Sequence, residues 1–350
     1  MLFGSKFFFI IFVLLCILYA CNHKSDKLII NSQKSKISNF HKKSNVEFRE
    51  FNSANLIKPL NFHFYQDNLI LSELGKEAIF LFHEFDINTG DSLSSFVKFG
   101  GGPSEVLSPI STGLINDDLY IYDLTTQKIV SLALDQNKNI NNEYTLNDFY
   151  MWVTFESDST ILGVGNRKSF AKIERLNFKN KSLGKEVAFH THIPDQYSTE
   201  FLQDICQTLL VTDPSGENYS LLYRYIDAVE IFKSNRKNSV LIQGPYFNEL
   251  SYEKAYTGEM FVMLHTEETT ENFIYAYATE KYIYGLYSGG KAIERESQTS
   301  NTIFVYDWEG NPVNEIILSR KILSFGITPL DDKIFSYDLD KGEIIYADLF

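Results

Sequence analysis

From about Phe62 onward, the sequence is a series of short apolar runs that are separated by turn residues. The runs at 68–71, 118–122 and 302–306 are rich in β-branched and aromatic residues, and Gly, Asn, Asp or Pro bounds them. Runs of this kind predict β-strands. No long stretch keeps apolar residues at the i, i+3, i+4 and i+7 positions of an amphipathic helix. The sequence therefore predicts an all-β fold.

Four segments repeat one small unit, in which a strand ends in an acidic residue, a polar turn follows and a second strand returns. The acidic residues are Asp86, Asp123, Asp307 and Asp338. We interpret each unit as the outer hairpin of a blade. Repeats of roughly 40 to 50 residues with four strands are typical of β-propellers. About 290 residues at about 48 per blade predict a six-bladed β-propeller of four-stranded antiparallel blades, with seven blades as the alternative.

The N-terminus has the layout of a secretory signal peptide. Lys6 precedes an uncharged run over residues 7–20, and Cys21 follows that run. The run contains fourteen residues, whereas a helix needs about 20 to cross a bilayer. The sequence therefore predicts a signal peptide at 1–20 and no permanent membrane-spanning anchor.

Leu18, Tyr19, Ala20 and Cys21 resemble a lipobox, the bacterial signal whose cysteine receives fatty acids such as palmitate. Two or three acyl chains anchor a protein stably. An ordinary signal peptide with a chance cysteine is the alternative. We predict lipidation at Cys21, a lipidated N-terminus and flexible tether over 21–60, and a propeller domain over 61–350.

After removal of the leader and acylation of Cys21, Cys206 is the one cysteine left, so the mature chain forms no internal disulfide. Cys206 follows an apolar segment and is interpreted as a small buried hydrophobe. The formal net charge of −13 repels phosphate backbones, which argues against nucleic acid as a partner.

Three parts of the chain resemble the TolB-like six-bladed propeller lipoproteins. Residues 282–290 and 302–313 are similar to the C-terminal half of that family. Residues 99–105 resemble the loop that follows its first blade, and residues 222–232 resemble a segment of a middle blade. The similarity spans about residues 60–350. The resemblance implies an exported, lipid-anchored propeller, and it supplies no catalytic residues.

Two motifs could bind a ligand. The loop from Gly100 to Glu105 is glycine-rich, but it lacks the Gly-Lys-Ser/Thr ending of a phosphate-binding loop, so we interpret it as a tight connection whose glycines adopt positive φ. His190 and His192 are two residues apart, which on a strand places both rings on one face, as a metal pair needs. Asp195 and Glu200 lie nearby, but no third ligand is evident.

The remaining candidates have simple structural interpretations. The segment 213–216 (Asp-Pro-Ser-Gly) reads as a β-turn rather than as a nucleophile elbow. The acidic residues at 267, 268 and 271 are either an acid–base cluster or, more often in such runs, a solvated loop. The tyrosines either pack between blades or line a binding face; they are Tyr275, Tyr277, Tyr282, Tyr284 and Tyr287.

The leading hypothesis is a non-enzymatic binding or scaffolding module that recognises an envelope protein or ligand through loops at one end of the ring. The alternative is a hydrolase or lyase with a site at the mouth of the central channel. The sequence predicts no catalytic, cofactor-binding or metal-binding residue. It favours a location in the envelope of a Gram-negative bacterium, where membrane lipid attached at Cys21 anchors the chain. The outer membrane is the preferred location. The protein could lie on either its periplasmic or its surface face.

Overall fold

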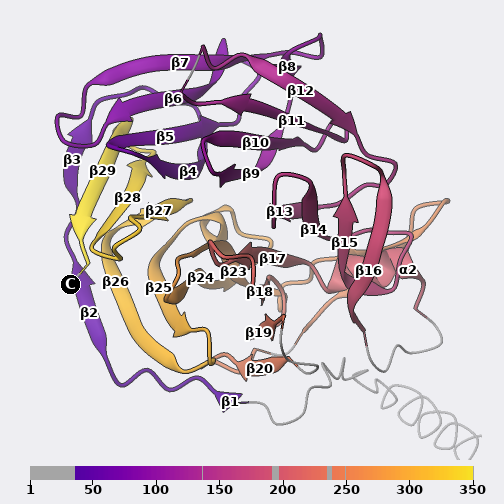
Figure 1. Cartoon of the computed structure of the whole chain (residues 1–350). Coiled ribbons are helices and arrows are strands. Elements are labelled where there is room, and N and C mark those ends of the chain that lie inside the picture. Colours follow the sequence, from indigo (N-terminus) through magenta and orange to yellow (C-terminus); the bar gives the residue numbers. More distant parts are fainter. Residues whose placement is uncertain (1–35, 136, 191–196, 235–238, 249, 350) are drawn as a thin grey trace, which may run out of the picture.

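The structure is a computed structural model that describes residues 36–349 except 136, 191–196, 235–238 and 249. Its strands form six blades arranged in a ring (Figure 1), which confirms the prediction of a six-bladed all-β propeller. Within each blade, consecutive strands pair in antiparallel order, except that the short β8 (Glu105–Val106) pairs with β7 (Ser92–Phe99) in parallel. The prediction that the chain is an exported lipoprotein rests on Cys21, which lies outside the described residues.

The first three blades follow one another along the chain. Blade 1 contains β4 (Pro59–Tyr65), β5 (Asn68–Glu73), β6 (Phe80–Asp86), β7 (Ser92–Phe99) and β8 (Glu105–Val106). Blade 2 contains β9 (Pro109–Ile115), β10 (Asp118–Asp123), β11 (Lys128–Ala133) and β12 (Ile140–Thr145). Blade 3 contains β13 (Trp152–Phe155), β14 (Thr160–Val164), β15 (Ala171–Asn177) and β16 (Ser182–Phe189).

The last three blades each gain a strand from the N-terminal region. Blade 4 contains β17 (Thr208–Thr212), β18 (Asn218–Tyr223), β19 (Ala228–Lys233) and β20 (Val240–Gln243). Blade 5 contains β23 (Thr270–Ala278), β24 (Tyr282–Lys291), β25 (Ser300–Asp307) and β26 (Pro312–Ile322). Blade 6 contains β27 (Phe325–Ile327), β28 (Lys333–Asp338) and β29 (Glu343–Asp348).

Residues 36–52 form a strap around the outside of the ring, drawn in indigo in Figure 1. Strand β1 (Lys36–Ile37) pairs with β20, β2 (Lys43–Val46) pairs with β26, and β3 (Arg49–Asn52) pairs with β29. The structure therefore differs from the expected flexible tether over 21–60, because residues 36–52 belong to the propeller. Residues 21–35 lie outside the described part of the chain.

Aromatic packing holds the strap against blade 5. Phe40 lies between β1 and β2 and is 9% exposed, and its ring stacks on Phe304 at a centroid distance of 4.7 Å. It also meets the edge of Tyr306, whose hydroxyl lies 3.1 Å from Ser38 Oγ. The strap is thus packed into the core between blades 4 and 5 as well as paired along its backbone.

The four acidic hairpin units all form, but only two of them are outer hairpins. Asp86 and Asp307 precede the turns between the third and fourth strands, as expected, whereas Asp123 and Asp338 precede the middle hairpins of blades 2 and 6. In the units at Asp86, Asp123 and Asp338, the carboxylate accepts N–H groups two and three residues ahead. This local turn chemistry works at any hairpin, so it does not report a strand's position in the blade.

The described residues also include two short helical elements, whereas the sequence predicted no helix. Helix α2 (Thr199–Ile205) begins after Ser198, whose hydroxyl accepts the N–H of Phe201, and η1 (Arg295–Gln298) is a single turn of 3₁₀ helix. Because α2 has only seven residues, its apolar positions do not repeat often enough to give a helical period.

The strap generates a stability prediction. Replacement of the buried Phe40 by alanine should lower the free energy of unfolding by about 3 kcal/mol, because a buried aromatic contact is replaced by a cavity. Phe170 is 41% exposed, so Phe170→Ala is the matched control and should change stability by less than about 0.5 kcal/mol. Urea denaturation of the full chain measures both; equal losses would contradict a structural role for the strap.

Candidate binding face

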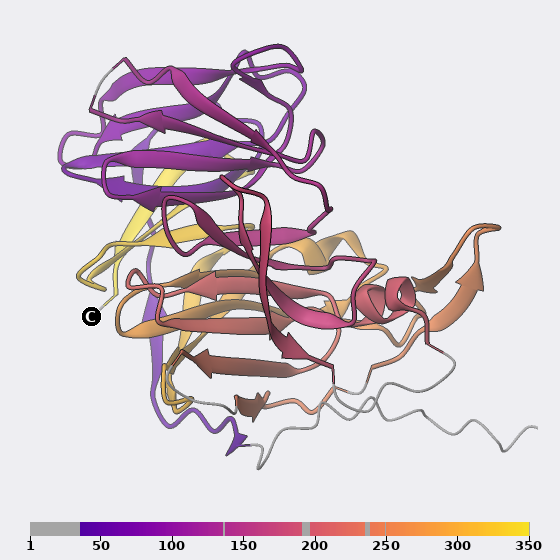
Figure 2. The ribbon, with the colours of Figure 1, turned by 45° about the vertical axis from the view of Figure 1, so that its right-hand side comes forward.

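The two ends of the ring differ in the length of their connections. We call the end at which the innermost strands β4, β9, β13, β17, β23 and β27 begin the loop face. At the opposite end, every connection between strands has six residues or fewer. On the loop face, the β16–β17 connection contains α2, and the β20–β23 connection contains a hairpin of β21 (Glu253–Tyr256) and β22 (Phe261–Leu264). Figure 2 shows this hairpin, in orange, projecting beyond the blades next to α2.

Helix α2 and the hairpin share a small apolar core of their own. Phe201, Leu202 and Ile205 from the helix are buried together with Cys206, and Met263 of β22 packs against them. Asp204 Oδ2 accepts the backbone N–H of Met263 at 2.8 Å. The hairpin is therefore fixed against the helix, although an isolated two-stranded hairpin is marginally stable in water.

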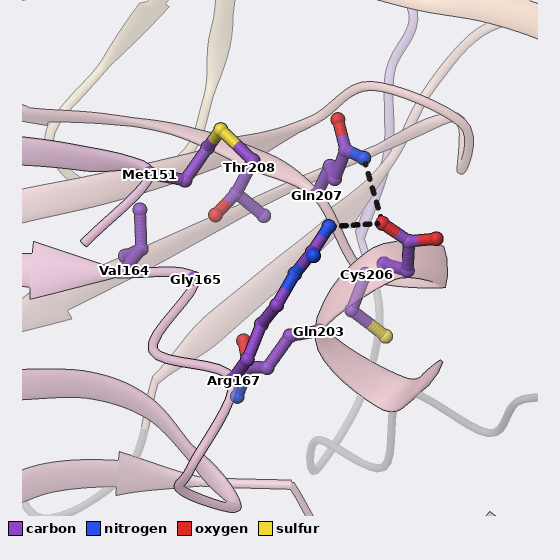
Figure 3. A pocket seen from close by; sticks show the side chains of 9 residues that line it. Met151, Val164, Gly165, Arg167, Gln203, Cys206, Gln207 and Thr208 are labelled. Atoms are coloured by element: carbon purple, nitrogen blue, oxygen red, sulfur yellow. Dashed lines mark hydrogen bonds and ion pairs between the residues drawn. The ribbon is translucent and has the colours of Figure 1, made fainter. Parts of the chain in front are cut away.

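A polar joint fastens this unit to blade 3 (Figure 3). Arg167, in the β14–β15 connection, places Nη2 3.3 Å from Asp204 Oδ1, and Gln207 Nε2 donates to the same oxygen at 3.5 Å. Arg167 Nη1 also lies 3.7 Å from the sulfur of Met260 in the hairpin turn. The pocket that these residues line has a volume of about 10 Å³, which is space for about one water. It is a joint between parts of the fold, too small for a ligand.

Exposed apolar side chains gather on the loop face. Of the large apolar residues that are exposed in the described part of the chain, only Leu93 and Leu330 lie toward the opposite end. The loop face carries the other ten, which are Ile57, Ile79, Phe170, Tyr246, Phe247, Tyr256, Phe261, Leu264, Ile293 and Leu339.

Tyr256 and Phe261 of this set lie on the projecting hairpin, where they face each other across its two strands near the turn. Their ring centroids are 5.1 Å apart, and Lys254 Nζ lies 4.2 Å from the centre of the Phe261 ring. The two rings are 60% and 41% exposed. They form a preorganised aromatic surface with a cation beside it.

The central channel is narrow and lacks a carboxylate in its described lining. Its cavity of about 110 Å³ is lined by residues of β4, β9, β13, β17 and β23. His63 Nε2 lies 2.6 Å from Thr112 Oγ1, and burial lowers the pKa of His63 to about 4. The ring is therefore neutral at physiological pH. None of the described lining residues is Asp or Glu, so the channel offers a neutral imidazole without an acidic partner.

The glycine-rich loop is a tight connection, but not for the predicted reason. None of Gly100, Gly101 and Gly102 has a positive φ, whereas Ser104 has φ 61°. A Cβ on Gly100 would lie 2.0 Å from Glu105 Oε2, and that oxygen accepts the N–H of Gly102 at 2.9 Å. Gly100 and Gly102 therefore make room for the Glu105 carboxylate, whereas Gly101 does not contact it.

The histidine pair is not assembled into a metal site in the described residues. His192 and Asp195 lie outside them. Burial, together with the Lys172 ammonium, lowers the pKa of His190 to about 3. Among the residues whose positions are given, no group of three or more His, Cys, Asp or Glu is arranged to hold a metal ion. Glu200 lies in the first turn of α2.

The acidic run does not form one cluster. Glu267 and Glu268 are exposed, and Glu268 pairs with Lys291 at 3.1 Å. Glu271 is 1% exposed, forms an ion pair with Arg224, and accepts Gln298 Nε2 at 2.9 Å. The solvated-loop interpretation is correct for the first two residues and wrong for Glu271, because strand β23 places it inside the seam between blades 4 and 5.

The other structural interpretations are confirmed. Asp213 to Gly216 form a turn in which the Gly216 N–H donates to the Asp213 carbonyl at 3.0 Å. Cys206 is buried, and burial raises the pKa of its thiol to about 12. Of the tyrosines, Tyr275, Tyr284 and Tyr287 are buried, whereas Tyr277 and Tyr282 are partly exposed and Tyr277 lines the channel. Packing is therefore the main use of these side chains.

The hairpin was not among the predicted elements, although the sequence carries a signal for it. A short run that ends in Ala255 and Tyr256 and an apolar run over 260–264 flank a Thr-Gly-Glu turn, and Gly258 has φ 95°. Such a pattern predicts a hairpin. Its place on the loop face depends on α2, which the sequence pattern did not indicate.

The described residues contain no helix with the length and apolar character needed to span a bilayer.

Comparisons with known proteins agree with this architecture. The family model described as TolB-like 6-blade propeller-like matches residues 38–329. A protein of Bacteroides fragilis described as exported is similar in structure, with a TM-score of 0.54 and 11% identity over 90% of this chain and 99% of its own. A member of the DUF4221 family from Bacteroides vulgatus has a TM-score of 0.55 and 8% identity over 91% of this chain and 96% of its own. No curated protein matches this sequence.

The channel histidine generates a pH prediction. The pKa of His63 is about 4 in the fold and about 6.5 when unfolded, so between pH 6.5 and 4 only the unfolded state binds the proton. Stability from this group is therefore present above pH 6.5 and falls as the pH drops, by roughly 3 kcal/mol at pH 4. His63→Gln should remove this part of the pH dependence in urea denaturation. Parallel curves for the two proteins would contradict the assignment.

Proposed function

Because the chain belongs to the TolB-like six-bladed propeller family, we propose that it is an exported binding module that recognises a protein partner through its loop face. The observation that carries this proposal is the gathering of ten exposed large apolar side chains at one end of the ring. Exposed apolar surface that is concentrated on one face is typical of interaction sites. The family and the similarity to an exported protein support a location outside the cytoplasm.

The chemistry of the loop face fits a protein rather than a nucleic acid or a small ligand. Tyr256 and Phe261 are rigid aromatic side chains of the type that contribute most to protein interfaces. Lys254 lies on the same face of the hairpin as both rings, and Glu259 is exposed in the turn, so charged groups of both signs border the aromatic centre. We infer that the partner offers an apolar patch bordered by polar and charged residues.

The enzyme with a site in the central channel is the less favoured function. The cavity of about 110 Å³ is smaller than the 300 to 1,000 Å³ of typical ligand pockets. Acid–base catalysis there would also need a second titrating group within reach of His63, and its hydrogen-bond partner is the hydroxyl of Thr112.

Attachment to the membrane is part of the proposal. Acylation at Cys21 would leave fourteen residues, 22–35, before the first strap strand. An extended chain of that length reaches at most about 50 Å. The propeller would thus stay near the bilayer, in the outer membrane by preference, while its loop face remains free to bind.

The loop face generates the first test. The unchanged protein should capture a partner from envelope extract, and the double variant Tyr256→Ser/Phe261→Ser should fail to capture it. The purified partner should bind this variant at least about 30-fold more weakly than it binds the unchanged protein. Leu93→Ser/Leu330→Ser is the matched control toward the opposite end and should bind normally. The proposal fails if the control loses the partner and the hairpin variant retains it.

The anchor generates the second test. In cells supplied with labelled palmitate, the full chain should incorporate the label and sediment with the membrane fraction. Cys21→Ser should do neither, whereas Cys206→Ser should behave like the unchanged protein, because its buried thiol is no substrate for acylation. Equal labelling of the Cys21→Ser chain would rule out lipidation at this position.

A further inference from the structure

The hairpin that projects from the loop face in Figure 2 is an incomplete sheet. Strands β21 and β22 form a sheet of two strands, whereas every other sheet in the described part of the chain has four or five. An isolated two-stranded hairpin is marginally stable, and packing against a helix or a third strand stabilises it. The hairpin has the helix and lacks the third strand. The direction of its backbone groups decides which edge can take one.

A hydrogen bond at the turn fixes this direction for the end of the hairpin. The Thr257 N–H donates to the Met260 carbonyl at 3.0 Å, so these two residues are the hydrogen-bonded pair next to the turn. Hydrogen-bonded and non-hydrogen-bonded pairs alternate along an antiparallel ladder. Tyr256 and Phe261 form the next pair in the register and are therefore not hydrogen-bonded to each other. Their backbone N–H and C=O groups point away from the opposite strand.

A contact with α2 gives the same direction independently. The Met263 N–H donates to Asp204 Oδ2 at 2.8 Å, so it points out of the hairpin toward the helix. Met263 pairs with Lys254 in the register, and this pair has the same character as the pair at Tyr256, as alternation requires. The backbone groups of Lys254 and Tyr256 thus point toward the outer edge of β21.

The two edges of the hairpin differ in what lies beside them. Helix α2 lies along β22, where Asp204 accepts the Met263 N–H and the Met263 side chain packs against the helix core. Strand β21 pairs with β22 alone among the described strands. Glu253, Lys254 and Tyr256 are exposed along it, and Ala255 is half-buried. The open edge of the hairpin is therefore that of β21.

The edge of β21 is regular. An open edge is a template for a strand from another chain, and proteins blunt such edges with bulges, prolines or lysines. Strand β21 contains no proline, and its register with β22 runs without a shift. Its one lysine, Lys254, carries its ammonium group 4.2 Å from the centre of the Phe261 ring, over the face of the hairpin. By contrast, the outer strand β7 of blade 1 has φ 58° at Val97 and is partly covered by β8.

The propeller already holds short added strands on its sheet edges. Strands β1 and β2 pair with the outer strands of blades 4 and 5, and they contain two and four residues. The stacking of Phe40 on Phe304 accompanies this pairing. Strand β21 also contains four residues, and it carries Tyr256 next to Phe261. It thus combines the same two features, a short edge and an aromatic contact beside it.

The side chains of the hairpin indicate the composition of the strand that would fit. Directly opposite residues on neighbouring strands place their side chains on the same face and pack together. A residue opposite Tyr256 would lie on the face that carries the rings of Tyr256 and Phe261, which suits a β-branched or aromatic side chain. The other face is apolar as well, because Ala255, Val262 and Leu264 alternate with the ring-bearing positions.

We propose that a protein partner adds an extended segment, rich in β-branched and aromatic residues, to the outer edge of β21. Main-chain hydrogen bonds to Lys254 and Tyr256 hold the segment, and the rings of Tyr256 and Phe261 select an apolar side chain at its centre. This inference rests on the proposed function of the loop face and states how that face recognises its partner.

The segment is tested with a phage-displayed library of linear peptides of about eight residues, selected on the full chain. Selected peptides should have apolar residues at alternate positions, because side chains of an added strand alternate between two faces. Synthesised with a fluorescent label, they should bind Tyr256→Ser/Phe261→Ser at least about 10-fold more weakly than the unchanged protein in fluorescence anisotropy. Leu93→Ser/Leu330→Ser should bind them normally.

The backbone contact is tested with two substitutions at one position. Lys254→Pro removes the N–H that points outward, and proline is tolerated where the N–H of an edge strand faces solvent. Lys254→Ala is the matched control, because it removes the same side chain and retains the N–H. The peptides should bind Lys254→Pro about 10-fold more weakly than Lys254→Ala. In the unchanged protein, a bound peptide should slow hydrogen exchange of the segment that contains Tyr256.

The proposal is overturned if the peptides bind Lys254→Pro and Lys254→Ala equally, if hydrogen exchange at Tyr256 is the same with and without peptide, or if no selected peptide depends on the two rings. In each of these cases the proposed function still holds when the partner from envelope extract depends on Tyr256 and Phe261, because a folded surface can contact the rings through side chains alone. The loss of that dependence contradicts the proposed function and this inference together.

Discussion

The pairing of β3 with β29 is the contact on which the ring depends. A blade has two apolar faces and buries both only between neighbours, so six blades must close on themselves. Blade 6 obtains three strands from the C-terminal end of the chain and its fourth from residues 49–52 near the N-terminal end of the described part. Without this strand, β29 would be left as an open edge, which is prone to pair with other chains. Strands β1 and β2 extend the closure over blades 4 and 5.

Close approach at the centre adds a second constraint to closure. Gly326 of β27 lies so near blade 1 that an added Cβ would be 2.4 Å from Cβ of Phe62. On the other side of blade 6, Phe325 packs edge-on against Tyr275 at a centroid distance of 5.3 Å. The innermost strands are thus packed tightly around a narrow channel. This leaves the loop face and the outer seams as the surfaces on which the chain has room for function.

The proposed binding function makes a specific demand on the fold. Recognition needs exposed side chains on a unit that projects, and the hairpin meets this need because Asp204 and the α2 core hold its base.

The sequence by itself determined the strands, their turns and the blade count, because alternation of apolar residues and acidic turn residues are local signals. It also marked Cys206 as buried and 213–216 as a turn for the same reason. Tertiary structure decided the fate of residues 36–52, whose strands are too short and polar to be recognised without the edges that they cover.

Tertiary structure likewise decided which distant residues meet. Ser95, His83 and Glu73 are ten and twelve residues apart along the chain, and only the register of β5, β6 and β7 brings them into contact. The ten apolar residues of the loop face are scattered from 57 to 339 in the sequence, and only ring closure brings them to one end. Local patterns fix which elements form, whereas a site made from several elements depends on how those elements pack.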